Sequence, residues 1–81
     1  MDVHPVVDRV MSELRAKREA LGMPQYEAAA RMGIPYRTFQ RYEVGESEPR
    51  ISEFIAWCRV LDMDVAALLQ PEPVFNGNPA A

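Results

Sequence analysis

An all-α, compact five-helix domain is the fold class that this sequence predicts. Apolar residues recur at intervals of three and four along most of the chain, which is the period of a helix buried on one side. Glycines and prolines interrupt this pattern where helices are expected to end and begin. At 81 residues the chain has the length of one domain. We expect a helical domain at residues 1–70 and an irregular, proline-rich tail at residues 71–81.

The first helix is expected from Pro5 to about Leu21. Proline is favoured at the first position of a helix, and Gly22 is a suitable residue to end it. Its apolar stripe comprises Val3, Val7, Val10, Leu14 and Leu21. The segment from Val3 to Val7 provides either additional cover for the core or an apolar strip for a second subunit.

Two short helices joined by a tight turn are predicted between residues 24 and 45. Gln25 to Met32 is rich in alanine and other good helix formers. Gly33 can adopt the left-handed conformation that ends a helix. Pro35 disfavours the helical conformation at Ile34 and suits the start of a new helix. The second helix is expected at residues 35–44, with Gly45 as its C-cap.

The second of these helices has one apolar and one polar side. Phe39 and Tyr42 lie three residues apart and define the buried side, and Ala29 on the first helix allows the two backbones to approach closely. The outer side then carries Tyr36, Arg37, Gln40 and Arg41. Arginine pairs with guanine and glutamine with adenine in the major groove of DNA, so this helix is predicted to read bases.

These residues resemble the Cro/repressor-type helix-turn-helix domain of phage and bacterial regulators (lambda-repressor-like, XRE family). The resemblance extends from about Val10 to Leu69. It is carried by Gln25, Ala29, Gly33, Ile34, Phe39, Tyr42, Glu43 and Gly45. It implies a sequence-specific, double-stranded DNA-binding transcriptional regulator, a small repressor that binds a palindromic operator as a homodimer.

The resemblance also implies roles for single residues. Glu43 is expected to form a structural ion pair with Arg18. The residues expected to contact DNA are Gln25, Tyr26, Tyr36, Arg37, Thr38, Gln40, Arg41 and Arg50. Among them, Arg37 and Arg41 are expected at base edges, whereas Gln25 and Arg50 position the DNA backbone.

A fourth helix is expected from Ile51 to Leu61 and a fifth from Val65 to Leu69, the latter with Asp64 as its N-cap. The apolar stripe of the fourth helix is Ile51, Phe54, Ile55, Cys58 and Leu61. The candidate residues for a dimer interface are Trp57, Val74 and Phe75. Trp57, at the edge of the stripe, fills the core or anchors an interface. Val74 and Phe75 pack back on the domain, pack on a partner subunit or belong to a disordered tail.

The charge of the chain favours a second interpretation. The net charge is -3, whereas a nucleic-acid binder is usually basic. Glu46 and Glu48 follow the predicted reading helix, and four arginines balance four glutamates between Gln25 and Arg50. The alternative function is therefore a protein-interaction module, antitoxin-like or cofactor-like, that binds DNA weakly.

Other classes of function have little support in the sequence. One cysteine and one histidine, far apart, predict no disulfide, no metal site, no cofactor and no enzyme activity. Apolar runs are much shorter than the roughly 18 residues of a membrane span, and no signal peptide is recognisable. A cytoplasmic protein with no small-molecule effector is expected.

Overall fold

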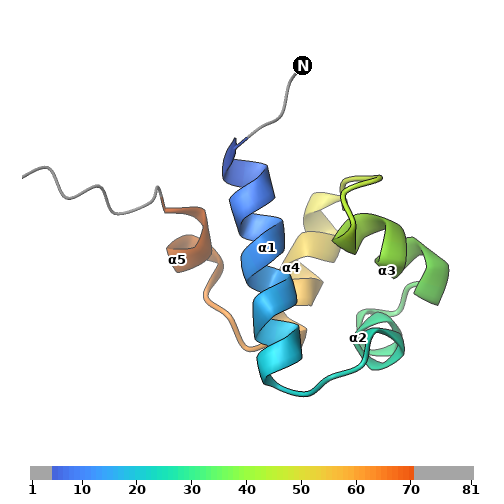
Figure 1. Ribbon diagram of the computed structural model, residues 1–81. Helices are drawn as coiled ribbons and strands as arrows, with labels where there is room; N and C mark the ends of the chain where they lie inside the picture. Colours follow the sequence, from blue (N-terminus) through green and yellow to red (C-terminus); the bar gives the residue numbers. More distant parts are fainter. Residues whose placement is uncertain (1–4, 71–81) are drawn as a thin grey trace, which may run out of the picture.

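The computed structural model describes residues 5–70, and every structural statement below refers to this part of the chain. It contains α1 (Pro5–Ala20), α2 (Gln25–Met32), α3 (Tyr36–Glu43), α4 (Ile51–Val60) and α5 (Val65–Leu69). In Figure 1, α1 crosses in front of α4, with α2 and α3 on one side of it and α5 on the other. The predicted all-α, five-helix fold is confirmed. The predicted tail at residues 71–81, including Val74 and Phe75, lies outside the described residues.

The turn between α2 and α3 forms as the sequence predicts. Gly33 has a φ of 75°, and the N–H groups of Gly33 and Ile34 donate to the carbonyls of Ala30 and Ala29, each over 3.1 Å. This is the Schellman arrangement that satisfies the last carbonyls of a helix. Pro35 then precedes α3 with an extended backbone, at φ -62°. These two residues direct α3 across the end of α2.

The core is built around Trp57, which is completely buried on α4. Its ring lies 4.8 Å from that of Phe39 and 6.4 Å from that of Tyr42, both on α3. Ala28 and Ala29 of α2 are also fully buried, which lets this helix approach its neighbours closely. The remaining buried apolar residues are Val10, Leu14, Met23, Cys58, Leu61 and Leu68. Side chains from all five helices thus contribute to one core, in which Phe39 and Tyr42 anchor α3.

The burial of Trp57 decides between the two roles predicted for it. We predicted either a core residue or an interface anchor at the edge of the apolar stripe, and 0% of this side chain is exposed. Trp57 therefore fills the core and offers no surface to a second subunit. Its indole N–H has no acceptor among the described residues.

The predicted stripe of α4 is partly wrong for the same reason. Ile51 and Ile55 are 74% and 37% exposed, whereas Trp57, Cys58 and Leu61 are buried. The large indole ring occupies the centre of the core, so the buried side of α4 is rotated toward it. Leu21, a residue of the predicted apolar stripe of the first helix, is 51% exposed, because α1 ends at Ala20 just before it.

Cys58 and Asp64 have the roles expected from the sequence. Cys58 is fully buried, and this burial raises the pKa of its thiol. Asp64 caps α5 by accepting a hydrogen bond from the N–H of Ala66 over 3.1 Å. No helix within residues 5–70 has the length and apolar character needed to cross a membrane.

Candidate nucleic-acid interface

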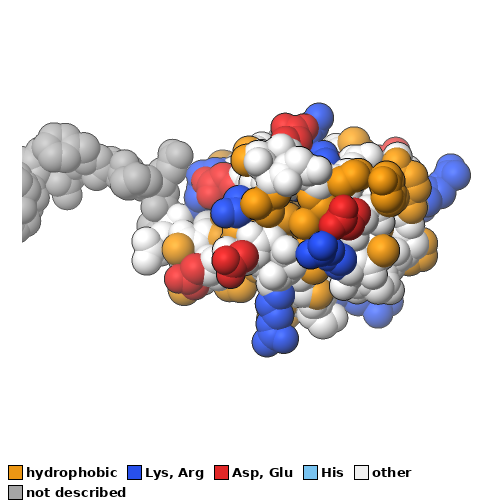
Figure 2. Space-filling model, turned by 90° about the horizontal axis from the view of Figure 1, so that it is seen from below, with side chains coloured by type: hydrophobic (Ala, Val, Ile, Leu, Met, Phe, Trp, Pro, Cys, Tyr) orange, Lys and Arg blue, Asp and Glu red, His pale blue; other side chains and the backbone are white. Residues whose placement is uncertain are grey.

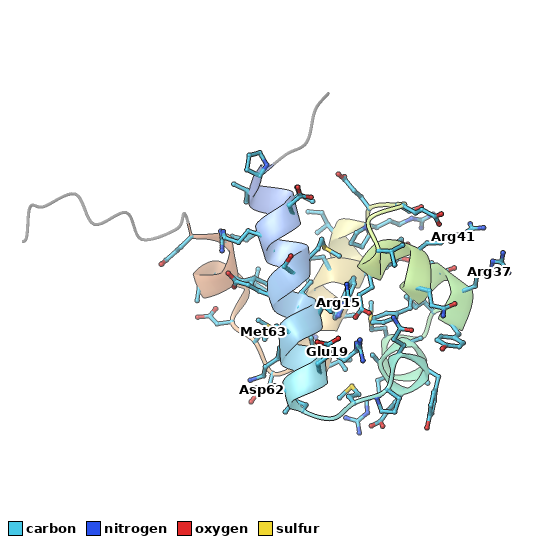
Figure 3. The ribbon with its side chains drawn as sticks, viewed as in Figure 1. Arg15, Glu19, Arg37, Arg41, Asp62 and Met63 are labelled. Carbon is cyan, nitrogen blue, oxygen red and sulfur yellow. The ribbon has the colours of Figure 1, made fainter. Side chains whose placement is uncertain are left out.

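The exposed side of α3 carries three polar residues that the sequence predicted for base reading. Arg37, Gln40 and Arg41, together with Val44 and Glu46, line one shallow hollow. Figure 3 shows Arg37 and Arg41 extending from α3 into solvent, on the side away from α1. We call the side of α3 formed by Arg37, Gln40 and Arg41 the reading face. It presents two guanidinium groups and one amide to any ligand that approaches this helix.

The other candidate DNA contacts are not gathered in this hollow. Tyr26 on α2 and Tyr36 at the start of α3 are exposed by 63% and 48%. Thr38 is half-buried, and Arg50 is exposed immediately before α4. These four residues lie around the two helices but outside the hollow. Only a ligand wider than the hollow would contact them together with Arg37 and Arg41.

A buried ion pair holds the opposite side of α3. The Arg18 Nε donates to the Glu43 Oε2 over 2.7 Å, and a second guanidinium nitrogen of Arg18 donates to Oε1 over 3.1 Å. The third nitrogen of Arg18 donates to the carbonyl of Met23 over 2.8 Å. The side chains of Arg18 and Glu43 are only 10% and 2% exposed. The structure therefore contains the ion pair that the resemblance implied, and this pair is bidentate.

Gln25 belongs to the same network. Its Nε2 donates to the Glu43 Oε1 over 2.6 Å, so the first residue of α2 is bonded to the last residue of α3. This side chain was expected to position the DNA backbone. In the structure its amide nitrogen is hydrogen-bonded to Glu43, which helps to fix the angle between the two helices.

A second hydrogen-bond centre fixes the loop after α3. The Tyr42 hydroxyl and the Arg50 N–H both donate to the Glu53 Oε1, over 2.6 and 2.9 Å. The Tyr42 bond is the main cause that lowers the pKa of Glu53, and the same bond raises the pKa of Tyr42. Sequence reasoning missed Glu53, although a glutamate at the third position of a helix is a recognised partner for the N-cap N–H.

The structure changes the charge balance that the sequence suggested. Glu43 is buried against Arg18, and Glu27 pairs with Arg31 over 2.7 Å. Around the reading face this leaves three arginines, Arg37, Arg41 and Arg50, against Glu46 and Glu48, a local balance of +1. On the face drawn in Figure 2, basic side chains stand singly among acidic and apolar ones.

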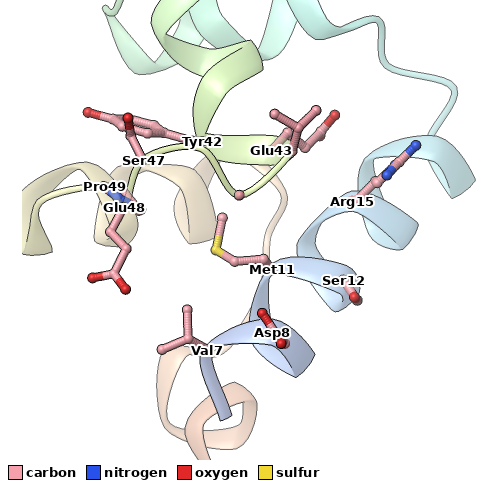
Figure 4. A pocket seen from close by; sticks show the side chains of 12 residues that line it. Val7, Asp8, Met11, Ser12, Arg15, Tyr42, Glu43, Ser47, Glu48 and Pro49 are labelled. Atoms are coloured by element: carbon pink, nitrogen blue, oxygen red, sulfur yellow. The ribbon is translucent and has the colours of Figure 1, made fainter. Parts of the chain in front are cut away.

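Glu46 lies on the reading face itself, which sequence reasoning did not foresee. Its Oε1 is 3.8 Å from the Arg41 Nε. Glu48 is directed elsewhere. It lines a second hollow between α1 and the loop after α3, with Val7, Asp8 and Met11 (Figure 4).

Residues 14–68 match the model of the family described as Helix-turn-helix (HTH_3). The chain belongs to the helix-turn-helix family. This match confirms the resemblance inferred from the sequence, and it includes α2 and α3 in full. The buried network of Arg18, Gln25 and Glu43 lies within it.

One curated relative of this helix-turn-helix protein is the "Uncharacterized HTH-type transcriptional regulator y4dL" of Sinorhizobium fredii (strain NBRC 101917 / NGR234). The two are 33% identical over 58 residues, which is 72% of this chain and 30% of the relative. The chain thus spans less than a third of the length of that relative. No solved structure matches the chain.

Proposed function

We propose that this helix-turn-helix protein is a sequence-specific, double-stranded DNA-binding transcriptional regulator, a small repressor, that inserts α3 into the major groove. The observation that carries the proposal is the two-sided construction of α3. Arg37, Gln40 and Arg41 are presented together in one hollow, while Phe39, Tyr42 and Glu43 fix the opposite side to the core. The name of the curated relative, a transcriptional regulator, supports the same function.

The chemistry of the reading face suits bases more than phosphates alone. Arg37 and Arg41 can each donate two hydrogen bonds to a guanine edge, and Gln40 can pair with adenine. Tyr36 packs on a thymine methyl group or bonds a phosphate. Tyr26, Thr38 and Arg50 surround this centre and would position the DNA backbone. Gln25 supports α3 through Glu43.

A homodimer on a palindromic operator completes the proposal. The eight residues of α3 are only about 12 Å long, so one copy reads few base pairs. Two-fold symmetry would double the contacts, with half-sites about one helical turn apart. The protein would act in the cytoplasm, without catalysis and without a small-molecule effector.

The alternative, a protein-interaction module, keeps one observation in its favour. Glu46 and Glu48 are both exposed in the loop after α3 and would repel phosphate. The burial of Trp57 removes the tryptophan that would have anchored such a partner. A folded protein that shows no sequence preference on duplex DNA at physiological salt would favour this alternative.

The test compares two exposed arginines, Arg41 on the reading face and Arg59 on α4. With a duplex obtained by selection, Arg41→Ala should weaken binding by about 1–3 kcal/mol and relax the preference at one base pair. Arg59→Ala should leave both unchanged. An equal loss for Arg41→Ala on the selected duplex and on random duplex would contradict base reading and leave a phosphate contact.

A further inference from the structure

α3, the helix that reads DNA in our proposal, ends in a Schellman motif. This motif places the carboxylate of Glu46 beside the reading face of α3. Gly45 has a φ of 85°, and its N–H donates to the carbonyl of Tyr42 over 3.1 Å. The N–H of Glu46 donates to the carbonyl of Arg41 over 2.9 Å. These two bonds form a Schellman motif, in which the second residue after the cap lies beside the third residue from the helix end. The backbone therefore sets Glu46 beside Arg41.

The same motif ends α2, where it brings two apolar residues together. There the N–H of Ile34 donates to the carbonyl of Ala29 over 3.1 Å. An apolar pair is the usual accompaniment of this closure. At the end of α3 the corresponding pair is charged instead. The guanidinium of Arg41 and the carboxylate of Glu46 lie 3.8 Å apart, with side chains 54% and 67% exposed.

This pair contributes little to folding, because ion pairs so exposed are weak. Its position matters for what binds. The carboxylate of Glu46 lines the same hollow as Arg37, Gln40 and Arg41. A carboxylate there repels every phosphate that approaches, and it lowers the gain from any contact between Arg41 and the DNA backbone. A carboxylate also accepts a hydrogen bond from the N4 amino group of cytosine in the major groove.

We propose that Glu46 is a specificity-determining residue, which selects a cytosine beside the base that Arg41 reads and weakens binding to duplexes without that cytosine. The inference rests on the proposed function, because it assigns a role within the same reading face. Negative charge in the loop after α3 weakens DNA binding in general. In this proposal, the same charge helps the protein to discriminate between sequences.

The neighbouring acid provides a matched control. Glu48 has the same side chain and lies two residues further along the loop, yet it lines the hollow next to Val7 and Met11 of α1. Figure 4 shows it extending toward the N-terminal end of α1. Glu46→Gln and Glu48→Gln each remove one negative charge, but only the first changes the reading face.

The experiment measures the affinity of the wild type, Glu46→Gln, Glu46→Ala and Glu48→Gln for a duplex selected by the wild type. The same measurement is made on random duplex and on duplexes with each base pair of the site changed in turn. Glu46→Ala, which removes the acceptor, should lose discrimination of about fivefold or more at one cytosine. Both Glu46 variants, which remove the charge, should gain affinity for random duplex. Glu48→Gln should change all affinities by one common factor.

Two results would overturn the inference in different ways. If Glu46 and Glu48 variants shift every affinity alike, Glu46 contributes only general charge and the proposed function still stands. If the folded wild type selects no sequence at all, the proposed function fails and the role of Glu46 fails with it. Because Glu46 is exposed, circular dichroism should show all variants folded.

Discussion

Arg18 and Glu43 join α1 to the last turn of α3 through a buried hydrogen bond of 2.7 Å between Nε and Oε2. The reading face lies on the other side of α3, so its orientation depends on this bond. Gln25 extends the same connection to the start of α2. One carboxylate thus links the three helices that determine how Arg37 and Arg41 are presented.

Removal of the negative charge from this network should destabilise the protein strongly. Glu43→Gln removes the buried carboxylate that pairs with Arg18 over 2.7 Å and leaves only the exposed Glu19, at 3.8 Å, near this guanidinium. We expect a loss of about 3–5 kcal/mol in the free energy of unfolding. Urea denaturation followed by circular dichroism measures it. The control is Glu27→Gln, which affects an exposed pair with Arg31 at 2.7 Å and should cost no more than about 1 kcal/mol. Similar losses for the two variants would contradict the account.

Tyr42→Phe should destabilise the protein in a manner that depends on pH. The variant loses the 2.6 Å bond to Glu53, and a hydrogen bond to a charged group contributes about 1.5–3 kcal/mol. Because this bond lowers the pKa of Glu53 below its ordinary 4.5, the contribution is present above that value and is lost as pH falls through the folded pKa. The gap between wild type and Tyr42→Phe should therefore shrink in acid.

At alkaline pH, the contribution of this bond is lost as pH rises rather than as it falls. The pKa of Tyr42 is raised above its ordinary 10.0, so its contribution is present below that value and is lost as pH rises through the folded pKa. Unfolding curves at a series of pH values measure both limits. Tyr36→Phe, a change at an exposed tyrosine, is the control. A stability gap for Tyr42→Phe that does not vary with pH would be inconsistent with the Glu53 bond.

The single tryptophan reports directly on the core. Because Trp57 is completely buried against Phe39 and Tyr42, its fluorescence should be blue-shifted and resistant to quenching by acrylamide. Neither property should change with protein concentration, since this side chain contacts no second subunit in our account. Emission typical of exposed indole, or protection that appears only at high concentration, would restore Trp57 as an interface residue.

The sequence predicts the interactions that act between neighbouring residues in the chain. Gly33, Pro35 and Asp64 act on their immediate neighbours, so the turn, the start of α3 and the cap of α5 follow from the sequence. The buried side of α4 does not, because Ile51 and Trp57 compete for the core and the outcome depends on α3. The apolar periodicity predicted the helix at α4 but not which of its sides is buried.

The reading face shows the same division. Phe39 and Tyr42 reveal which side of α3 is buried, and the exposed positions of Arg37 and Arg41 follow. The approach of Glu46 to Arg41 depends on the Schellman motif at Gly45. The sequence predicts this approach only if Gly45 is recognised as part of a complete Schellman motif. The bond of Tyr42 to Glu53 joins two elements across a loop, and no spacing rule predicts it.

Whether α3 reads bases is tested most directly by selection of the wild-type protein on a random duplex pool at moderate salt. The double variant Arg37→Ala/Arg41→Ala and the control Arg59→Ala are tested in parallel. We expect the wild type and Arg59→Ala to enrich a palindromic sequence with half-sites about one helical turn apart, and the double variant to lose this enrichment. No enrichment by folded wild-type protein would contradict base reading by α3.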